Sequence, residues 1–166
     1  MTLASFTDWL SNTPPSNVIR DVTWIIPVVQ SIHIILIAIV ISSTTMFNVR
    51  LLQLGRNAES PARMAQRVFP WVWWALLGLL LSGSLLILGE PVRELLSPAF
   101  AFKIVVILLV APLTLLFQAT LRRDDRFWSS SLGRRYAARG LAMLSLLMWL
   151  SVLTAGRWIA YYQAST

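Results

Sequence analysis

Residues 104–121 read IVVILLVAPLTLLFQATL, a run of eighteen residues without Asp, Glu, Lys or Arg. Three further uncharged stretches cover residues 22–49, 68–89 and 140–156. A helix needs about 20 mostly apolar residues to cross the roughly 30 Å of hydrocarbon in a bilayer. Each stretch approaches or exceeds that length, so the sequence predicts an integral membrane protein with four spanning helices.

The apolar runs do not alternate between apolar and polar residues, as the strands of a membrane β-barrel would. Helices satisfy their own backbone hydrogen bonds in lipid, so we expect an all-α, four-helix bundle that forms a single membrane domain, residues 1–166. We place the spans at about residues 22–47, 70–89, 99–121 and 140–161.

The first residues carry an amphipathic pattern. Leu3, Phe6 and Leu10 fall on one helical face, and polar residues fill most of the other. This pattern is typical of a helix that lies in the membrane interface, which we place at residues 2–12. A proline pair directly after it should end the helix, because proline cannot continue the hydrogen-bond ladder.

The charges are distributed unevenly along the chain. Ten of the fourteen basic residues lie in two loops, residues 50–67 and 122–139, which join the first span to the second and the third to the fourth. Positively charged loops stay in the cytoplasm, so we expect an N-out and C-out topology. The net charge of +7 therefore indicates orientation in a lipid bilayer, and we expect no nucleic acid partner.

The composition argues against most enzyme classes. The chain has no cysteine, which excludes disulfides, thiolate nucleophiles and iron–sulfur clusters. It shows no nucleophile–base pair, no His/Glu cluster with metal-ligand spacing and no glycine-rich phosphate loop. We therefore expect no stand-alone enzyme.

Polar groups within the predicted spans are the candidates for function, because they are costly at membrane depth and often functional. His33 is the only histidine, and it should lie near the middle of the bilayer, about twelve residues after the first span begins. Gln30 shares its helical face. Three roles stay open for His33: axial ligand of a haem b, part of a proton or quinone site, or a hydrogen bond to another helix.

A membrane b-type haem normally has two histidine ligands, and this chain has one histidine. Met148 lies at a similar predicted depth and is a candidate second ligand, since His/Met ligation of haem iron is known and raises the reduction potential. A histidine of another subunit is an alternative. Lys103 and Arg157, at the outer ends of their spans, are candidate partners for haem propionates. His33 and Met148 could also contact a soft metal such as copper.

Other residues indicate helix packing and helix starts. Ala75, Gly78 and Ser82 could let another helix approach closely or could leave room for a flat cofactor. Asn48 and Gln118 should hydrogen-bond across helices. A serine–proline pair at residues 60–61 is typical of a helix start, and we expect a separate short helix between it and the second span.

Several motifs are shared with a known family: the span-one His33, the segment VRLL at residues 49–52, FPW at residues 69–71, and the ending AGRWIAY at residues 155–161. In these motifs the chain resembles a family of uncharacterised bacterial four-helix inner-membrane proteins, known as a domain of unknown function. The resemblance implies the same topology in a bacterial inner (cytoplasmic) membrane. The chain is more distantly similar to b-type cytochrome and copper-resistance membrane bundles.

These observations favour an inner-membrane subunit that serves as an electron relay or a membrane anchor, with a hydrophobic cofactor, haem or quinone, near His33. The expected partners are other membrane-protein subunits or a second copy of the chain, and a quinone or redox partner. A non-redox assembly or scaffold protein and a small copper-handling membrane protein stay open as alternatives.

Overall fold

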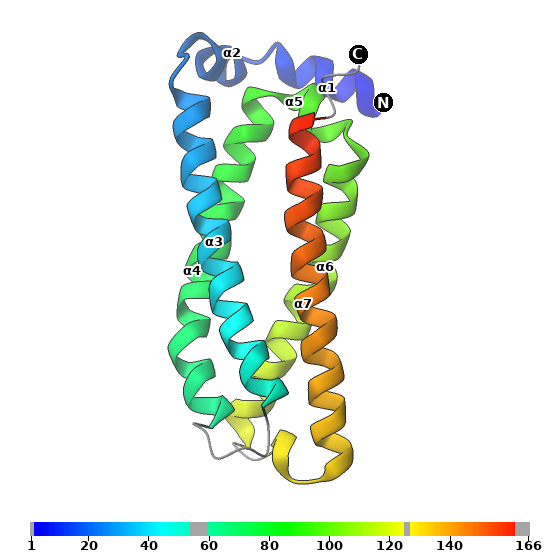
Figure 1. Cartoon of the computed structure of the whole chain (residues 1–166). Helices are drawn as coiled ribbons and strands as arrows, with labels where there is room; N and C mark the ends of the chain where they lie inside the picture. The colour runs from blue at the N-terminus through cyan, green and yellow to red at the C-terminus, as the bar shows by residue number, and fades with distance from the viewer. Residues whose placement is uncertain (1, 54–59, 125–126, 162–166) are drawn as a thin grey trace.

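The computed structural model describes residues 2–53, 60–124 and 127–161, with side chains described as far as Trp158. Four long helices run side by side (Figure 1): α3 (Ile25–Leu52), α4 (Pro61–Gly89), α6 (Pro98–Arg123) and α7 (Leu132–Tyr161). Each of them is long and apolar enough to cross a membrane, and the described residues form no strand. The prediction of an all-α membrane four-helix bundle is confirmed, and the chain is a multi-pass membrane protein.

Short helices cover the two ends of the bundle. α1 (Leu3–Ser11) and α2 (Pro14–Asp21) lie across one end, close to α5 (Pro91–Leu95) (Figure 1). We call this the terminal end, because the chain enters α3 and leaves α7 there. The 3₁₀ helix η1 (Phe127–Ser129) lies at the opposite end, which we call the loop end.

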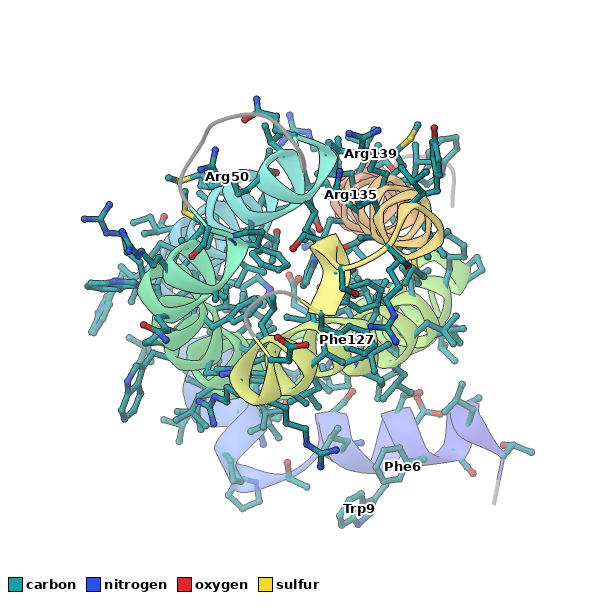
Figure 2. All side chains as sticks on the ribbon, turned by 90° about the horizontal axis from the view of Figure 1, so that it is seen from below. Phe6, Trp9, Arg50, Phe127, Arg135 and Arg139 are labelled. Carbon is teal, nitrogen blue, oxygen red and sulfur yellow. The ribbon has the colours of Figure 1, made fainter. Side chains whose placement is uncertain are left out.

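α1 is the predicted interfacial helix. Its N-cap, Thr2, accepts a hydrogen bond through Oγ1 from the Ser5 amide at 3.3 Å. Thr7 is buried against the protein, whereas Phe6 and Trp9 are exposed and point away from the long helices (Figure 2). The proline pair ends α1 as expected, but it also begins α2, which the sequence reading missed, because proline suits the first turn of a helix.

α4 corrects one expectation. Ser60 does begin a helix, and its Oγ accepts a hydrogen bond from the Arg63 amide at 3.3 Å. The separate short helix before the second span is wrong, since α4 runs without a break from Pro61 to Gly89 with Pro70 inside it. Proline removes one hydrogen bond from a helix, and burial of Val68 and Phe69 in the core holds the turns before Pro70 in line.

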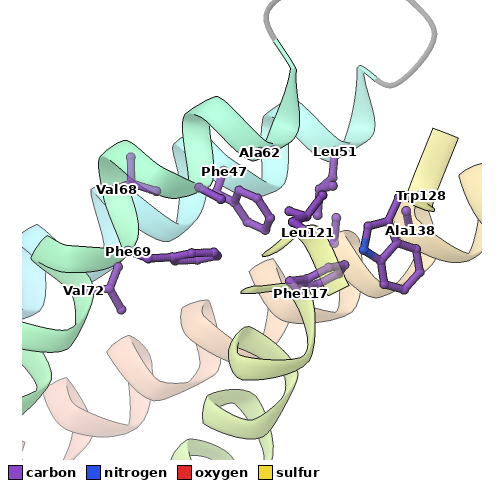
Figure 3. Close-up of a cluster of buried hydrophobic side chains, with 12 residues drawn as sticks. Phe47, Leu51, Ala62, Val68, Phe69, Val72, Phe117, Leu121, Trp128 and Ala138 are labelled. Carbon is purple, nitrogen blue, oxygen red and sulfur yellow. The ribbon is translucent and has the colours of Figure 1, made fainter. Parts of the chain in front are cut away.

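The main core lies toward the loop end and joins all four long helices (Figure 3). Phe47 packs against Phe69 and Phe117 with ring centroids 4.9 Å and 5.6 Å apart, and Phe117 lies 5.3 Å from Trp128. Trp128 also donates a hydrogen bond from Nε1 to Thr120 Oγ1 at 2.8 Å. Tilted and edge-on rings at these distances attract one another beyond simple packing, so this aromatic cluster stabilises the loop end of the bundle.

A smaller cluster closes the middle of the bundle, with Val40, Ala75, Val110 and Trp149 each supplied by a different long helix. Beyond it, α3 has no buried residue in the described stretch 25–39. Figure 1 shows α3 with α4, and α6 with α7, as two pairs that separate toward the terminal end. The pairs are therefore joined in the loop-end half and the middle.

Two hydrogen bonds between helices fix how the pairs align. Asn48 Nδ2 of α3 donates to Ser145 Oγ of α7 at 3.1 Å, and both side chains are buried. Trp73 Nε1 of α4 donates to Gln118 Oε1 of α6 at 2.9 Å. The expectation that Asn48 and Gln118 hydrogen-bond across helices is confirmed.

Candidate functional site

His33 lies on α3 in the half of the bundle near the terminal end, where its side chain is half-buried. Its Nδ1 lies 2.8 Å from Oγ of Ser82, a buried residue of α4. The imidazole is thus held between two helices by a polar contact inside an otherwise apolar region.

Small residues of α4 make this contact feasible. A Cβ atom on Gly78 would lie 2.8 Å from Leu36 Cδ1, and one on Gly89 would lie 3.2 Å from Ile26 Cδ1. α3 therefore approaches α4 more closely than larger side chains would allow. Two roles were considered for Gly78, close helix packing and room for a flat cofactor, and the structure has close packing of Leu36 against it.

A chain of two hydrogen bonds orients the imidazole. Ser82 Oγ lies 2.7 Å from the carbonyl oxygen of Gly78, to which it donates. A serine hydroxyl has one hydrogen and two lone pairs, so this donation leaves Oγ as an acceptor for His33. Nδ1–H then donates to Ser82, and Nε2 of His33 keeps its lone pair.

The imidazole edge lies against an open position on α4. A Cβ atom on Gly83 would lie 3.5 Å from His33 Cε1, which is ordinary van der Waals contact. Gly83 therefore leaves the His33 ring in ordinary contact with α4, and a bulky side chain at this position would crowd Cε1.

Lys103 of α6 is brought toward His33. The positive charge of Lys103 repels a positive charge on His33, whereas the carboxylate of Glu94 on α5 attracts Lys103. Lys103 Nζ also lies 5.1 Å from the ring centroid of Phe100, which is a cation–π contact. Gln30, one turn from His33 along α3, is exposed.

Arg157 lies near the depth of His33, but Met148 does not. The Asn48–Ser145 bond sets the register of the antiparallel helices α3 and α7, with His33 15 residues before Asn48 and Arg157 12 residues after Ser145. At about 1.5 Å per residue, Arg157 and His33 differ in depth by roughly 5 Å.

Met148 is only three residues past Ser145, so it lies about 18 Å from His33 along the bundle axis. It packs against the middle cluster that contains Val40 and Trp149. The structure therefore does not bring Met148 and His33 together. The prediction that the two residues lie at a similar depth is wrong. The physical reason is the register of the two helices: the assumed spans put residues 47 and 140 at one level, whereas the bond puts Asn48 level with Ser145, which moves Met148 about 9 Å toward the loop end.

Two buried polar groups were not identified from the sequence, one at His33 and one in the middle cluster. Ser82 was noted only for its size, and its role as hydrogen-bond partner depends on the register between α3 and α4. Trp149 Nε1 is buried in the middle cluster and has no hydrogen-bond partner among the described atoms. Within residues 2–53, 60–124 and 127–161, no group of three or more His, Cys, Asp or Glu side chains could hold a metal ion.

Comparison of the chain with protein-family models, with curated proteins and with solved structures found no match. The resemblance drawn from the sequence motifs therefore stays a prediction. Function has to be argued from the His33 site itself.

Proposed function

We propose that this chain is a subunit of a bacterial inner-membrane complex that holds a hydrophobic cofactor, haem b or a quinone, at His33 and relays electrons to a partner. The single observation that carries the proposal is the hydrogen-bond chain from His33 through Ser82 to Gly78. It fixes one ring nitrogen of a membrane-embedded imidazole and leaves the other nitrogen with its lone pair.

Such an arrangement is what a haem ligand requires. A histidine that binds a metal almost always donates its other ring N–H to a neighbouring acceptor, which sets the tautomer and the ring orientation. Ser82 supplies that acceptor here at 2.8 Å. An ionisable side chain within a membrane span is also energetically costly and often functional, which favours a functional role for His33.

The surroundings also suit a large apolar ligand. α3 has no buried residue in the described stretch 25–39, so the side chains on both sides of His33 are at least partly exposed. Lys103 and Arg157 approach the same depth and would face the acidic groups of a haem. Because Met148 lies about 18 Å away along the axis, His33 would hold a haem iron without help from Met148. A second axial ligand would come from a partner subunit or a second copy.

The orientation is part of the proposal. The loop end carries most of the arginines, and there Arg134 stacks on Phe127 at 4.4 Å while Arg135 Nε donates to Ser129 O at 3.0 Å (Figure 2). The excess of positive charge in these loops supports a cytoplasmic loop end, with both termini outside. His33 would then lie in the outer half of the membrane, within reach of a redox partner on that side.

One observation favours a second candidate function. The contacts of His33 with Ser82, Asn48 with Ser145 and Trp73 with Gln118 each join two helices. A non-redox scaffold subunit would need such bonds to lock its bundle, with no cofactor at all. The copper-handling alternative loses its expected pair of contacts, because Met148 lies about 18 Å from His33 along the bundle axis. The described residues also hold no group of three or more His, Cys, Asp or Glu side chains that could bind a metal ion.

The visible spectrum of the protein, purified in detergent from cells supplied with excess haem precursor, separates these functions. We expect a Soret band in the oxidised and the dithionite-reduced protein, and its loss in His33→Ala. Ser82→Ala should keep the ligand but weaken haem retention by about 10- to 100-fold, since it removes the group that orients the ring. Lipid extraction and chromatography of the same sample would detect a retained quinone.

Gly83 offers a matched pair of variants. Gly83→Ala should leave the spectrum unchanged, because its Cβ meets His33 Cε1 at an ordinary 3.5 Å. Gly83→Leu should abolish cofactor retention by filling the space beside the ring. Size-exclusion profiles and thermal unfolding of each variant would show whether it is folded. A colourless, quinone-free wild-type protein would overturn the cofactor proposal and leave the scaffold function.

A further inference from the structure

We infer that the terminal end contains a binding site for a lipid headgroup phosphodiester, built around Arg20 of α2 and Arg93 of α5. A cavity of about 180 Å³ lies there, between the short helices and the last turn of α4. Ser11, Arg20, Glu90 and Arg93 are among its lining residues. Since a water molecule occupies about 30 Å³ of the liquid, the cavity has room for a phosphate group with its ester oxygens.

Close packing of α2 on α4 places Arg20 at this cavity. A Cβ atom on Gly89 would lie 3.1 Å from Cγ2 of Ile19, which is buried, so α2 rests directly on the end of α4. Arg20 follows Ile19 in the chain and lines the cavity beside Gly89. Its Nη2 donates to the carbonyl oxygen of Ser11 and to Asn17 Oδ1, the latter at 3.0 Å. These bonds tie α1 to α2 and hold the guanidinium in place.

Arg93 brings a second guanidinium with unused donors. Its Nη1 lies 2.5 Å from Glu90 Oε2, which forms an ion pair. Its Nε is buried and has no hydrogen-bond partner among the described residues. Buried donors in folded proteins are normally satisfied, so this N–H indicates a missing acceptor. The planar fork of a guanidinium suits the oxygens of a phosphate group.

The charge of the lining selects the kind of phosphate. Two guanidinium groups and the Glu90 carboxylate give the cavity a formal charge of +1. That charge balances the single negative charge of a phosphodiester. The Glu90 carboxylate would repel the additional charge of a phosphomonoester or of free phosphate.

The level of the cavity along the bundle axis indicates that the phosphodiester belongs to a membrane lipid. Trp9 of α1 and Trp24, just before α3, are among the exposed aromatic residues at the terminal end. Exposed tryptophans mark the headgroup level of a membrane protein. The cavity lies at the same end, where the apolar span of α4 finishes at Gly89.

Native mass spectrometry of the full chain in detergent, titrated with dioleoylphosphatidylglycerol, tests the site. We expect at least a fivefold increase in the apparent Kd in Arg20→Gln and in Arg93→Gln. Arg67→Gln is the matched control, since Arg67 is an exposed arginine at the loop end and the charge change is the same. Its Kd should equal that of the wild type. Equal Kd values in all four proteins would overturn the inference.

Two further ligands identify what is recognised. Dioleoylglycerol lacks the phosphate and should not occupy the site, so equal occupancy by it would overturn the inference. Inorganic phosphate should not displace the lipid at millimolar concentration, and displacement would show that the site takes a free anion. If Arg93→Gln fails to fold, Arg93→Lys keeps the charge without Nε and should still raise the Kd. None of these variants touches His33, so the visible spectrum is an independent readout.

Discussion

The hydrogen bond between Asn48 and Ser145 makes a quantitative prediction about how α3 is held against α7. The donor and acceptor lie 3.1 Å apart, and the two side chains are only 2% and 3% exposed. Ser145→Ala removes the acceptor and leaves the Asn48 amide buried. We expect a loss of about 1–2 kcal/mol in the free energy of unfolding, because a buried unpaired donor costs about 1–3 kcal/mol.

The pairwise energy should be smaller than this loss. Hydrogen bonds between membrane helices contribute about 0.6 kcal/mol on average and about 1.7 kcal/mol at most. In a double-mutant cycle with Asn48→Ala, the double variant should therefore be less destabilised than the sum of the single variants by about 0.6–1.7 kcal/mol. Since about 1.4 kcal/mol corresponds to a factor of ten, the unfolding equilibrium constant should reveal a coupling of roughly three- to fifteenfold.

Titration of the protein with dodecyl sulfate in mixed micelles, followed by tryptophan fluorescence, would measure these free energies. Ser84→Ala is the matched control, because the Ser84 hydroxyl is exposed and donates only to Leu80 O of its own helix at 2.8 Å. That variant should change the stability by less than about 0.5 kcal/mol. The reasoning fails if Ser145→Ala costs no more than Ser84→Ala, or if the cycle is additive.

Two further variants test the packing of the bundle in the same assay. Phe117→Ala should cost about 3–5 kcal/mol, because the ring is 1% exposed and contacts two other aromatic rings. Leu116→Ala, on the exposed side of the same helix, should cost under about 0.5 kcal/mol, and equal losses would contradict the assigned core. Gly78→Ala should cost about 1–3 kcal/mol by overpacking, because its Cβ would come within 2.8 Å of Leu36 Cδ1. Adding Leu36→Ala should restore part of that loss, and no recovery would show that the clash lies elsewhere.

The fold could be predicted from the sequence because the bilayer restricts the options. Uncharged runs of this length have to be spanning helices, and the serine–proline pairs at residues 60–61 and 97–98 mark where two of them start. Helix length was harder to predict, since a hydropathy pattern ends where charged residues appear. α4 and α7 each extend by about two turns through residues with arginines, at 61–69 and 132–139. The depth of Met148 depends in addition on the register of α7 against α3, which the Asn48–Ser145 bond sets.

The candidate site could be predicted only in part. His33 was identified because a lone histidine in an apolar run is conspicuous, and Lys103 was placed correctly at the start of its helix. The partner of His33 was not identified, because the Ser82 contact depends on how α3 and α4 are aligned. A single sequence contains the spacing within each helix but not the alignment between helices. The cavity at Arg20 and Arg93 depends on such alignment as well.

The aromatic cluster has a consequence for how the protein could diversify. It holds the four long helices together toward the loop end (Figure 3). Among the described residues, fewer contacts between aromatic rings hold them together at the terminal end. Exposed residues of the half near the terminal end, such as Gln30, can therefore be exchanged at small cost to the stability of the fold. A bundle of this kind can acquire a site for a different ligand through a few substitutions far from the aromatic cluster that stabilises the fold.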